Sequence, residues 1–156
     1  MEAPKIIFPD IAATPRFALD EVGFSGANTT YFLASTDRYL LGLLNSRLAF
    51  FYFKKTFAGL EGKEEIYLRF FGQYMETFPV RGSLAHDRDR TSPEFAIAKA
   101  VDTLLEGYGK MDRVNAPSNR ARMKRDIHSV ENQIDRLVYT LYELTPEQVS
   151  VVESAT

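Results

Sequence analysis

The chain has 156 residues, a length that suits one domain, or one domain with a helical extension. Hydrophobic residues make up 45% of the sequence, which is enough to build a sizeable core. The absence of cysteine excludes disulfide bonds, thiolate metal sites and cysteine nucleophiles, and the net charge of −2 counts against a free-standing DNA-binding protein, because such proteins usually carry a basic face.

The first 80 residues carry strand patterns around one long helical pattern. Short runs rich in β-branched and aromatic residues predict strands at 5–8, 16–20, 29–34 and 66–71. Two glycines, a serine and an asparagine predict a loop at 23–28. Leucines and aromatic residues at helical spacing then predict one helix over about 37–55, which glycines at 59 and 62 bring to an end.

The second half of the chain is helical in pattern. A polar, charged stretch at 81–92 indicates a linker, in which Asp87 and Asp89 alternate with arginines and stay solvated. Apolar residues then follow a heptad spacing twice, around a turn at 112–118. Two heptad helices joined by a short turn form an antiparallel hairpin. A last short helix begins at Thr145, which is followed by proline and by the glutamine of a capping box.

These patterns together predict an α+β fold. We expect a mixed α/β lobe with a small mixed sheet over residues 1–80, a linker at 81–92, and an antiparallel two-helix hairpin with a short C-terminal helix over 93–156. No apolar run approaches the roughly 20 residues needed to span a bilayer, and the N-terminal residues lack the features of a signal peptide. We therefore expect a cytoplasmic protein that does not associate with membranes.

Catalytic signatures are hard to find in this sequence. It contains no Gly-rich phosphate loop and no Gly-x-Ser-x-Gly elbow. His128 and Glu131 share a helix face, but two ligands are too few for a catalytic zinc, and an exposed polar face is the favoured interpretation. Asp10 with Glu61 and Lys63 superficially matches the pattern of magnesium-dependent nucleases, although a turn and a polar loop explain these residues better. We expect no catalytic residue and no metal site.

Two groups of basic residues leave the choice between nucleic-acid binding and simple solvation open. The first stands at the start of the last long helix and consists of Arg120, Arg122, Lys124 and Arg125. These residues could grip phosphates or form the solvent face of the hairpin. The second group places lysines and an arginine among the aromatic residues of 53–70, a mixture that suits nucleic-acid contact but is also common in cores.

Several segments resemble one known family. They are KIIFPDI at 5–11, PRFALD at 15–20, TTYF at 29–32, YLLGLLNSRL at 39–48 and QIDRLVYTLYELT at 133–145. In this order they resemble the TaqI-like C-terminal specificity domain of adenine-specific restriction–modification methyltransferases, including fused type IIG enzymes. More distantly the chain is similar to the specificity subunits of type I systems, in which a recognition lobe precedes spacer helices.

The resemblance implies a target-recognition domain rather than an enzyme. Such a domain reads a short DNA sequence and positions it for base flipping by a neighbouring catalytic domain, which would bind S-adenosylmethionine, and Mg²⁺ if it also cleaves. The Asn-Pro-Pro-Tyr motif of these methyltransferases is absent here, so the chain resembles the recognition part alone, with no cofactor of its own. Residues 61–65 carry three acidic side chains where the family tends to have basic ones.

The expected partners are therefore double-stranded DNA and the methyltransferase or endonuclease domain of the parent enzyme. From residue type and loop position, the DNA-contacting candidates are Lys5, Arg16, Asn28, Thr29, Lys54, Lys55, Lys63 and Arg69. The alternative is a scaffold or dimerisation module that associates through the helical hairpin, without DNA binding of its own. The acidic pI of about 5.7 favours this alternative for the isolated chain.

Overall fold

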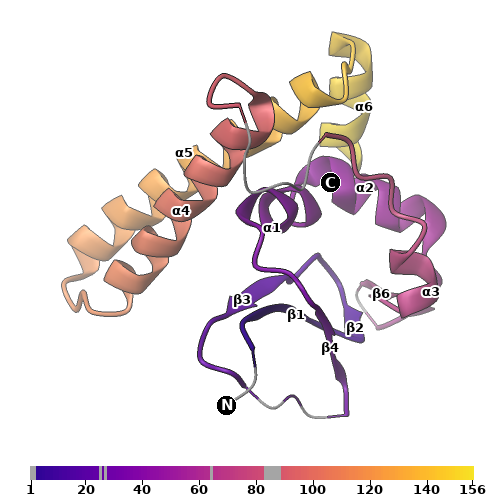
Figure 1. The fold of residues 1–156 in the computed structure, drawn as a ribbon, viewed down its shortest axis with the longest axis horizontal. Coiled ribbons are helices and arrows are strands. Elements are labelled where there is room, and N and C mark those ends of the chain that lie inside the picture. The colour runs from indigo at the N-terminus through magenta and orange to yellow at the C-terminus, as the bar shows by residue number, and fades with distance from the viewer. Residues whose placement is uncertain (1–2, 25, 27, 64, 83–88) are drawn as a thin grey trace.

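The N-terminal half of the chain forms two small sheets with short helices, and the C-terminal half forms two long helices and a short one (Figure 1). This architecture comes from a computed structural model, which describes residues 3–24, 26, 28–63, 65–82 and 89–156. It confirms the predicted fold class, a mixed α/β lobe followed by a helical hairpin and a short C-terminal helix.

The first sheet is built around strand β1 (Lys5–Pro9). Strand β1 pairs antiparallel with β3 (Ala18–Asp20) on one side and with β4 (Thr30–Leu33) on the other. Because side chains alternate along a strand, Ile6 and Phe8 of β1 both enter the core, where they are almost completely buried. The three predicted strands of this sheet are thereby confirmed.

The second sheet has the order β2–β6–β5 and is also antiparallel. Its strands are β2 (Ile11–Ala12), β5 (Gly59–Glu61) and β6 (Ile66–Arg69). The chain passes from one sheet to the other at Asp10. Its backbone N–H donates to the Thr29 carbonyl beside the first sheet, and its carbonyl accepts from the Phe70 N–H beside the second. Where the sequence predicts one small mixed sheet, the structure has two sheets, and every strand pair in them is antiparallel.

The helical pattern between the sheets forms two helices rather than the single one predicted. Helix α1 (Arg38–Leu44) begins at Asp37, whose carboxylate accepts from the backbone N–H groups of the first turn. Helix α2 (Arg47–Thr56) has its own N-cap, Ser46, whose Oγ accepts from the Ala49 N–H and donates to the Leu43 carbonyl. This local hydrogen bonding competes with a continuous helix and explains the break. The short helix α3 (Gly72–Met75) was not predicted.

The heptad segments form the predicted antiparallel hairpin. Helix α4 (Pro93–Met111) packs along α5 (Pro117–Leu141), and α6 (Pro146–Ala155) follows with the predicted capping box at Thr145. The heptad residues nearest the body are buried, whereas Tyr108 farther out is half-exposed. Figure 1 shows the hairpin projecting from the rest of the molecule, so that only its proximal part packs against α1.

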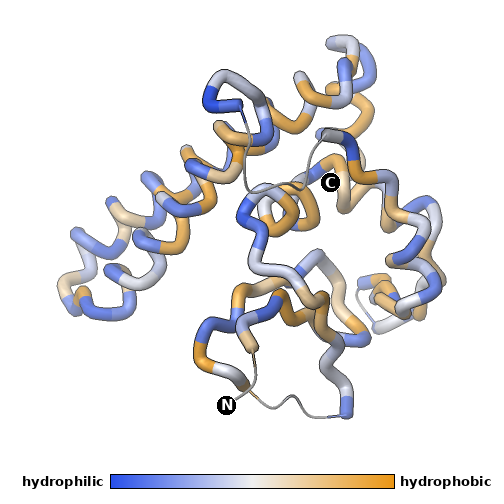
Figure 2. The backbone as a smooth tube through the Cα atoms, in the orientation of Figure 1, coloured by the Kyte–Doolittle hydropathy of each residue, from blue (hydrophilic) through white to orange (hydrophobic). Residues whose placement is uncertain are grey.

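One continuous hydrophobic core joins the lobe to the hairpin. In Figure 2 the hydrophobic stretches of the strands, of α1 and of the hairpin face one another. Within the lobe the fully buried Phe53 ring lies 4.6 Å from the Phe57 ring and 5.4 Å from the Phe70 ring, between centroids. Phe53, Phe57 and Phe70 therefore belong to the core. Tyr67, the fourth aromatic residue of 53–70, reaches the surface.

Helix α1 approaches α4 closely because it carries a glycine at the contact. A Cβ atom added to Gly42 would lie 2.7 Å from Val101 Cγ2 and 2.9 Å from Ile97 Cγ2. Both distances are shorter than a van der Waals contact, and the valine and isoleucine branches have little freedom to move. The packing of the lobe against the hairpin therefore depends on the absence of a side chain at this position.

We expect Gly42→Ala to lower the free energy of unfolding by about 1–3 kcal/mol, the usual cost of overpacking a core. The matched control is Gly109→Ala in α4, where an added Cβ meets nothing within 4 Å. That control should instead raise stability by up to about 1 kcal/mol, because alanine is the better helix former. Denaturant unfolding of both variants tests this, and equal effects would contradict a tight α1–α4 contact.

Candidate nucleic-acid interface

The turn between α1 and α2 is fastened to strand β3 by a side-chain amide. Asn45 Oδ1 accepts from the Phe17 N–H at 3.0 Å, and Asn45 Nδ2 donates to the Phe17 carbonyl at 2.9 Å. A third bond joins Asn45 Nδ2 to the Leu41 carbonyl. The asparagine thus pairs with the backbone before β3 as a neighbouring strand would, and it sets where the loop containing Arg16 leaves the core.

The same turn is fastened to the hairpin by a carboxylate. The backbone N–H of Arg47 donates to Asp135 Oδ1 at 2.9 Å, across 88 residues of sequence. The Arg47 Nε lies 3.9 Å from the other carboxylate oxygen. The segments 39–48 and 133–145 therefore meet in space at these two residues, and their polar side chains connect the lobe to the hairpin.

Two tyrosines hold the end of the lobe against the hairpin. The Tyr142 hydroxyl donates to the Pro79 carbonyl at 2.6 Å and accepts from the Arg81 N–H at 3.1 Å. The Tyr39 hydroxyl of α1 donates to the Arg81 carbonyl. The chain therefore leaves the lobe along a defined path before it enters the region 83–88.

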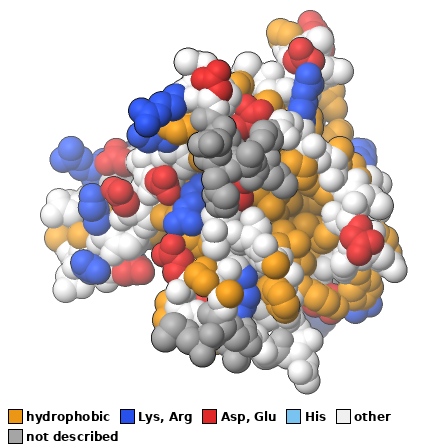
Figure 3. Space-filling view, viewed as in Figure 1, with side chains coloured by type: hydrophobic (Ala, Val, Ile, Leu, Met, Phe, Trp, Pro, Cys, Tyr) orange, Lys and Arg blue, Asp and Glu red, His pale blue; other side chains and the backbone are white. Residues whose placement is uncertain are grey.

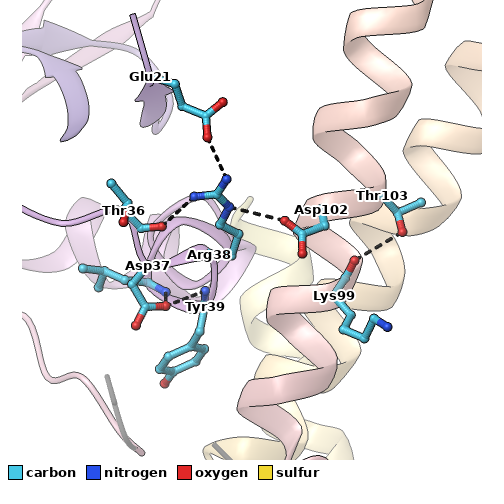
Figure 4. A network of polar contacts seen from close by, with 9 residues as sticks. Glu21, Thr36, Asp37, Arg38, Tyr39, Lys99, Asp102 and Thr103 are labelled. Atoms are coloured by element: carbon cyan, nitrogen blue, oxygen red, sulfur yellow. Dashed lines mark hydrogen bonds and ion pairs between the residues drawn. The ribbon is translucent and has the colours of Figure 1, made fainter. Parts of the chain in front are cut away.

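Arg38 links three elements through its guanidinium group (Figure 4). Its Nη2 donates to Glu21 after β3 at 2.8 Å, and its Nε donates to Asp102 of α4 at 3.3 Å. Its Nη1 donates to the backbone carbonyl of Thr36. Because the guanidinium fork engages both acids at once, it fixes the angle between the first sheet and the hairpin more firmly than a single surface ion pair would.

The loop after β3 is shaped by one carboxylate. Asp20 accepts from the backbone N–H groups of Val22, Gly23 and Phe24. Burial alone would raise the pKa of Asp20, but these three bonds and the ammonium of Lys5 together hold it below its usual value. Lys5, a predicted DNA contact, is thus buried beside Asp20, with 3.8 Å between Nζ and Oδ2.

Arg69, another predicted DNA contact, lies at the junction of the two sheets. Its Nη2 lies 3.6 Å from Asp10 Oδ2, and its guanidinium covers the Phe71 ring at 4.3 Å from the centroid. The Arg69 Nε and the Asp10 Oδ1 are buried without a hydrogen-bond partner in the described structure. The Asp10 backbone N–H also donates to the Thr29 carbonyl at 2.9 Å, so Arg69, Thr29 and the adjacent Asn28 come together at this junction.

The remaining candidates are exposed but lie in separate places. Arg16 lies in the loop before β3, and Lys63 lies in the turn between β5 and β6. Lys55 lies near the end of α2 with its Nζ 5.5 Å from the Phe51 ring centroid. Lys54, on the same helix, turns towards α6 and donates to the Ala155 carbonyl at 2.6 Å. The structure therefore brings only some of the candidates to one surface.

Apolar side chains around the first sheet were not among the predicted contacts. Val22 is 82% exposed, Phe24 57% and Phe32 64%. In Figure 3 hydrophobic side chains gather on the lobe, whereas charged side chains of both signs cover the projecting hairpin. The alternation of side chains along β4 places Phe32 opposite the inward-facing residues, so its exposure could be expected from the sequence. No function was predicted for this face.

A cleft of about 620 Å³ separates the loop before β3 and α1 from the hairpin. On its hairpin side, Glu131 accepts from the Tyr108 hydroxyl at 2.8 Å and lies 3.5 Å from His128 Nδ1. Burial, together with the hydrogen bond and charge of Glu131, raises the pKa of Tyr108 to about 12. His128 and Glu131, considered above as metal ligands, thus line this cleft, where Glu131 is hydrogen-bonded to Tyr108.

The described residues contain no group of three histidine, aspartate or glutamate side chains that could hold a metal ion. Asp10 pairs with Arg69, whereas Glu61 ends strand β5. His86, Asp87 and Glu64 lie outside the described residues, as does half of the predicted linker, residues 83–88. No helix in the described part of the chain has the length and apolar character needed to cross a membrane.

Comparison with known proteins gives one family. The family model described as the TaqI-like C-terminal specificity domain matches residues 1–80, which include both sheets and helices α1 to α3. No curated protein matches the chain. The matched region ends where Tyr142 of the hairpin holds the backbone of Pro79 and Arg81.

Substitutions at Asp135 test whether the segments 39–48 and 133–145 serve mainly to connect the lobe to the hairpin. Asp135→Ala should lower the free energy of unfolding by about 1 kcal/mol, because the Arg47 N–H loses its acceptor. Asp135→Asn keeps an acceptor and should cost less.

The pH dependence of stability, compared between the wild type and Asp135→Asn, provides a second test. Burial raises the pKa of Asp135 in spite of the opposing hydrogen bond and charge of Arg47. The stability of the wild type relative to Asp135→Asn should therefore fall as the pH rises from below 3.8 through the raised pKa. Denaturant unfolding at several pH values measures this difference, and a difference independent of pH would contradict the account.

Proposed function

Because the chain belongs to the TaqI-like C-terminal specificity domain family, we propose that its lobe reads a short DNA sequence and positions it for adenine methylation by a restriction–modification enzyme. The match over the whole lobe is the observation that carries this proposal. The methylation, and any cleavage, would be performed by a catalytic domain outside residues 1–156, which would bind S-adenosylmethionine, and Mg²⁺ for cleavage. The lobe 1–80, the linker 81–92 and the hairpin segment 93–156 would act as separate functional units.

The proposed reading surface lies around the junction at Asp10. The exposed Asn28 and Thr29 of the β3–β4 loop lie at this junction, whereas Lys63, in the β5–β6 turn, would contact DNA from the other end of strand β6. Asparagine can pair with adenine in the major groove, and threonine can bond to a base edge or contact the thymine methyl group. The exposed Tyr67 on β6 adds an aromatic ring to this side of the second sheet.

The other candidates take supporting or phosphate-binding roles in this proposal. Arg16 and Lys55 are exposed cations that would contact the DNA backbone without reading sequence. Lys5 would act indirectly, since it neutralises the carboxylate that shapes the β3–β4 loop. The Arg69 side chain is 34% exposed although its Nε is buried, so the exposed part of its guanidinium would contact DNA from its position over Phe71.

The net charge of the chain limits the affinity that it can have for DNA on its own. Basic side chains that neutralise phosphates supply most non-specific affinity, and the chain has 19 basic against 21 acidic residues. The catalytic domain would therefore supply part of the phosphate contacts. The second candidate function is a scaffold that binds this domain or a second copy of the chain, and the exposed Val22, Phe24 and Phe32 favour it.

Selection from a pool of random duplex DNA over a salt series separates the two functions. The recognition proposal predicts binding that weakens as salt rises and that enriches one short motif in the bound fraction. Absence of binding even at low salt would remove self-sufficient recognition and leave the scaffold. Binding without any enriched motif would also contradict the proposal, since it would be electrostatic attraction alone.

Two alanine substitutions should affect this binding differently. Lys55→Ala should weaken binding to all sequences alike and reduce the slope of log affinity against log salt by about 0.9, the value for one phosphate contact. Asn28→Ala should change the preferred base at one position, at a cost of about 1–3 kcal/mol. Arg136→Ala, at an exposed position on α5, serves as the control for loss of one charge. Identical behaviour of all three variants would exclude a localised reading surface on the lobe.

A further inference from the structure

The distal end of the helical hairpin concentrates positive charge in an otherwise acidic chain. Residues 110–126 contain six basic and two acidic side chains, a net charge of +4, whereas the remaining 139 residues carry −6. The basic residues are Lys110, Arg113, Arg120, Arg122, Lys124 and Arg125. All six are exposed. A count over the two halves of the chain does not show this imbalance, because the acidic residues of the second half lie nearer the body.

Four acidic side chains of the hairpin are already engaged within the chain. Asp102 binds Arg38, Asp135 binds the Arg47 backbone, and Glu143 binds Arg81. Glu131 is bonded to Tyr108. By contrast, none of the six distal cations forms an ion pair within the described part of the chain, where their one side-chain hydrogen bond joins Arg120 to the Val114 carbonyl at 3.5 Å. The distal cations therefore remain available to an external anion.

The position of this cluster suits a contact remote from the lobe. Gly42 of α1 meets α4 at Val101, and Met111 lies ten residues farther along the helix, which corresponds to about 15 Å at 1.5 Å per residue. Figure 1 shows the tip of the hairpin at the lower left and the β3–β1–β4 sheet at the bottom of the view, as separate projections. The Arg38 bridge and the α1–α2 turn hold these projections at a fixed angle.

We propose that the distal hairpin is a second DNA-contacting surface that grips backbone phosphates outside the sequence read by the lobe. This inference rests on the proposed function. Phosphate is the partner that the residues fit, because exposed lysine and arginine side chains contact it without any apolar anchor. A membrane surface fits less well, since amphipathic helices that bind membranes also present an apolar face, whereas the apolar side of this hairpin packs α4 against α5.

The test compares two double variants with the same change in net charge. Arg122→Gln with Arg125→Gln removes cations from the tip, and Lys99→Gln with Arg136→Gln removes exposed cations from parts of the hairpin nearer the body. Affinity is measured over a salt series for the duplex motif that the wild-type chain selects, embedded in a longer duplex. The tip variant should reduce the slope of log affinity against log salt by about 1–2, with the motif unchanged, while the control variant keeps the wild-type slope.

Each outcome separates this inference from the function on which it rests. An unchanged slope in the tip variant, or an equal reduction in both variants, would overturn the second surface while the wild-type chain still selected its motif. Failure of the wild-type chain to bind any duplex would overturn the recognition function and the hairpin contact together. Circular dichroism and thermal melting of both variants show whether folding is preserved, and Arg122→Lys with Arg125→Lys should restore the slope if charge is the cause.

Discussion

The hydrogen bonds of the turn between α1 and α2 are the constraint on which the arrangement of the molecule depends. Asn45 pairs with the backbone of Phe17, and the N–H of Arg47 donates to Asp135. These bonds join a strand, two short helices and a long helix whose residues are far apart in sequence. Buried and half-buried backbone groups are costly to leave unpaired, so this turn has one arrangement in which all of these groups are satisfied.

The consequence is a lobe and a hairpin that behave as one packed body. Gly42 allows α1 to touch α4, and Arg38 holds Glu21 and Asp102 on either side of the contact. The orientation of the hairpin relative to the sheets is therefore set by packing and by charge together. A family that reads DNA benefits from such rigidity, because contacts on two projections can follow one duplex only when the angle between them is fixed.

The sequence predicted the parts of the fold that rest on local patterns. Short runs rich in β-branched and aromatic residues identified β1, β3, β4 and β6, and the heptads identified the hairpin. The two-residue and three-residue strands β2 and β5 were missed, because they are too short to show a period and form only against β6. The break at Ser46 was missed because leucines continue the helical spacing across it.

The candidate site was less accessible to sequence reasoning, for a physical reason. The environment of a lysine or arginine depends on which acidic residue the fold places beside it. Lys5 meets Asp20 through the β1–β3 register, and Arg69 meets Asp10 where the sheets join. Neither pair is close in sequence, so both cations were expected to be free. The cluster at Arg120 to Arg125 was visible in the sequence, but its isolation from acidic partners emerged only in the folded hairpin.

The most direct test of the account is hydrogen exchange of the whole chain with and without its selected duplex. The recognition account predicts that the specific duplex slows exchange of backbone amides at residues 26–29 and 62–66, relative to a duplex of scrambled sequence. These segments belong to the β3–β4 loop and to the β5–β6 turn with the first residue of β6, and their described residues are exposed. Protection confined to the exposed apolar side chains around Val22 and Phe32, or to the cleft between lobe and hairpin, would contradict a DNA-reading surface at the junction of the two sheets.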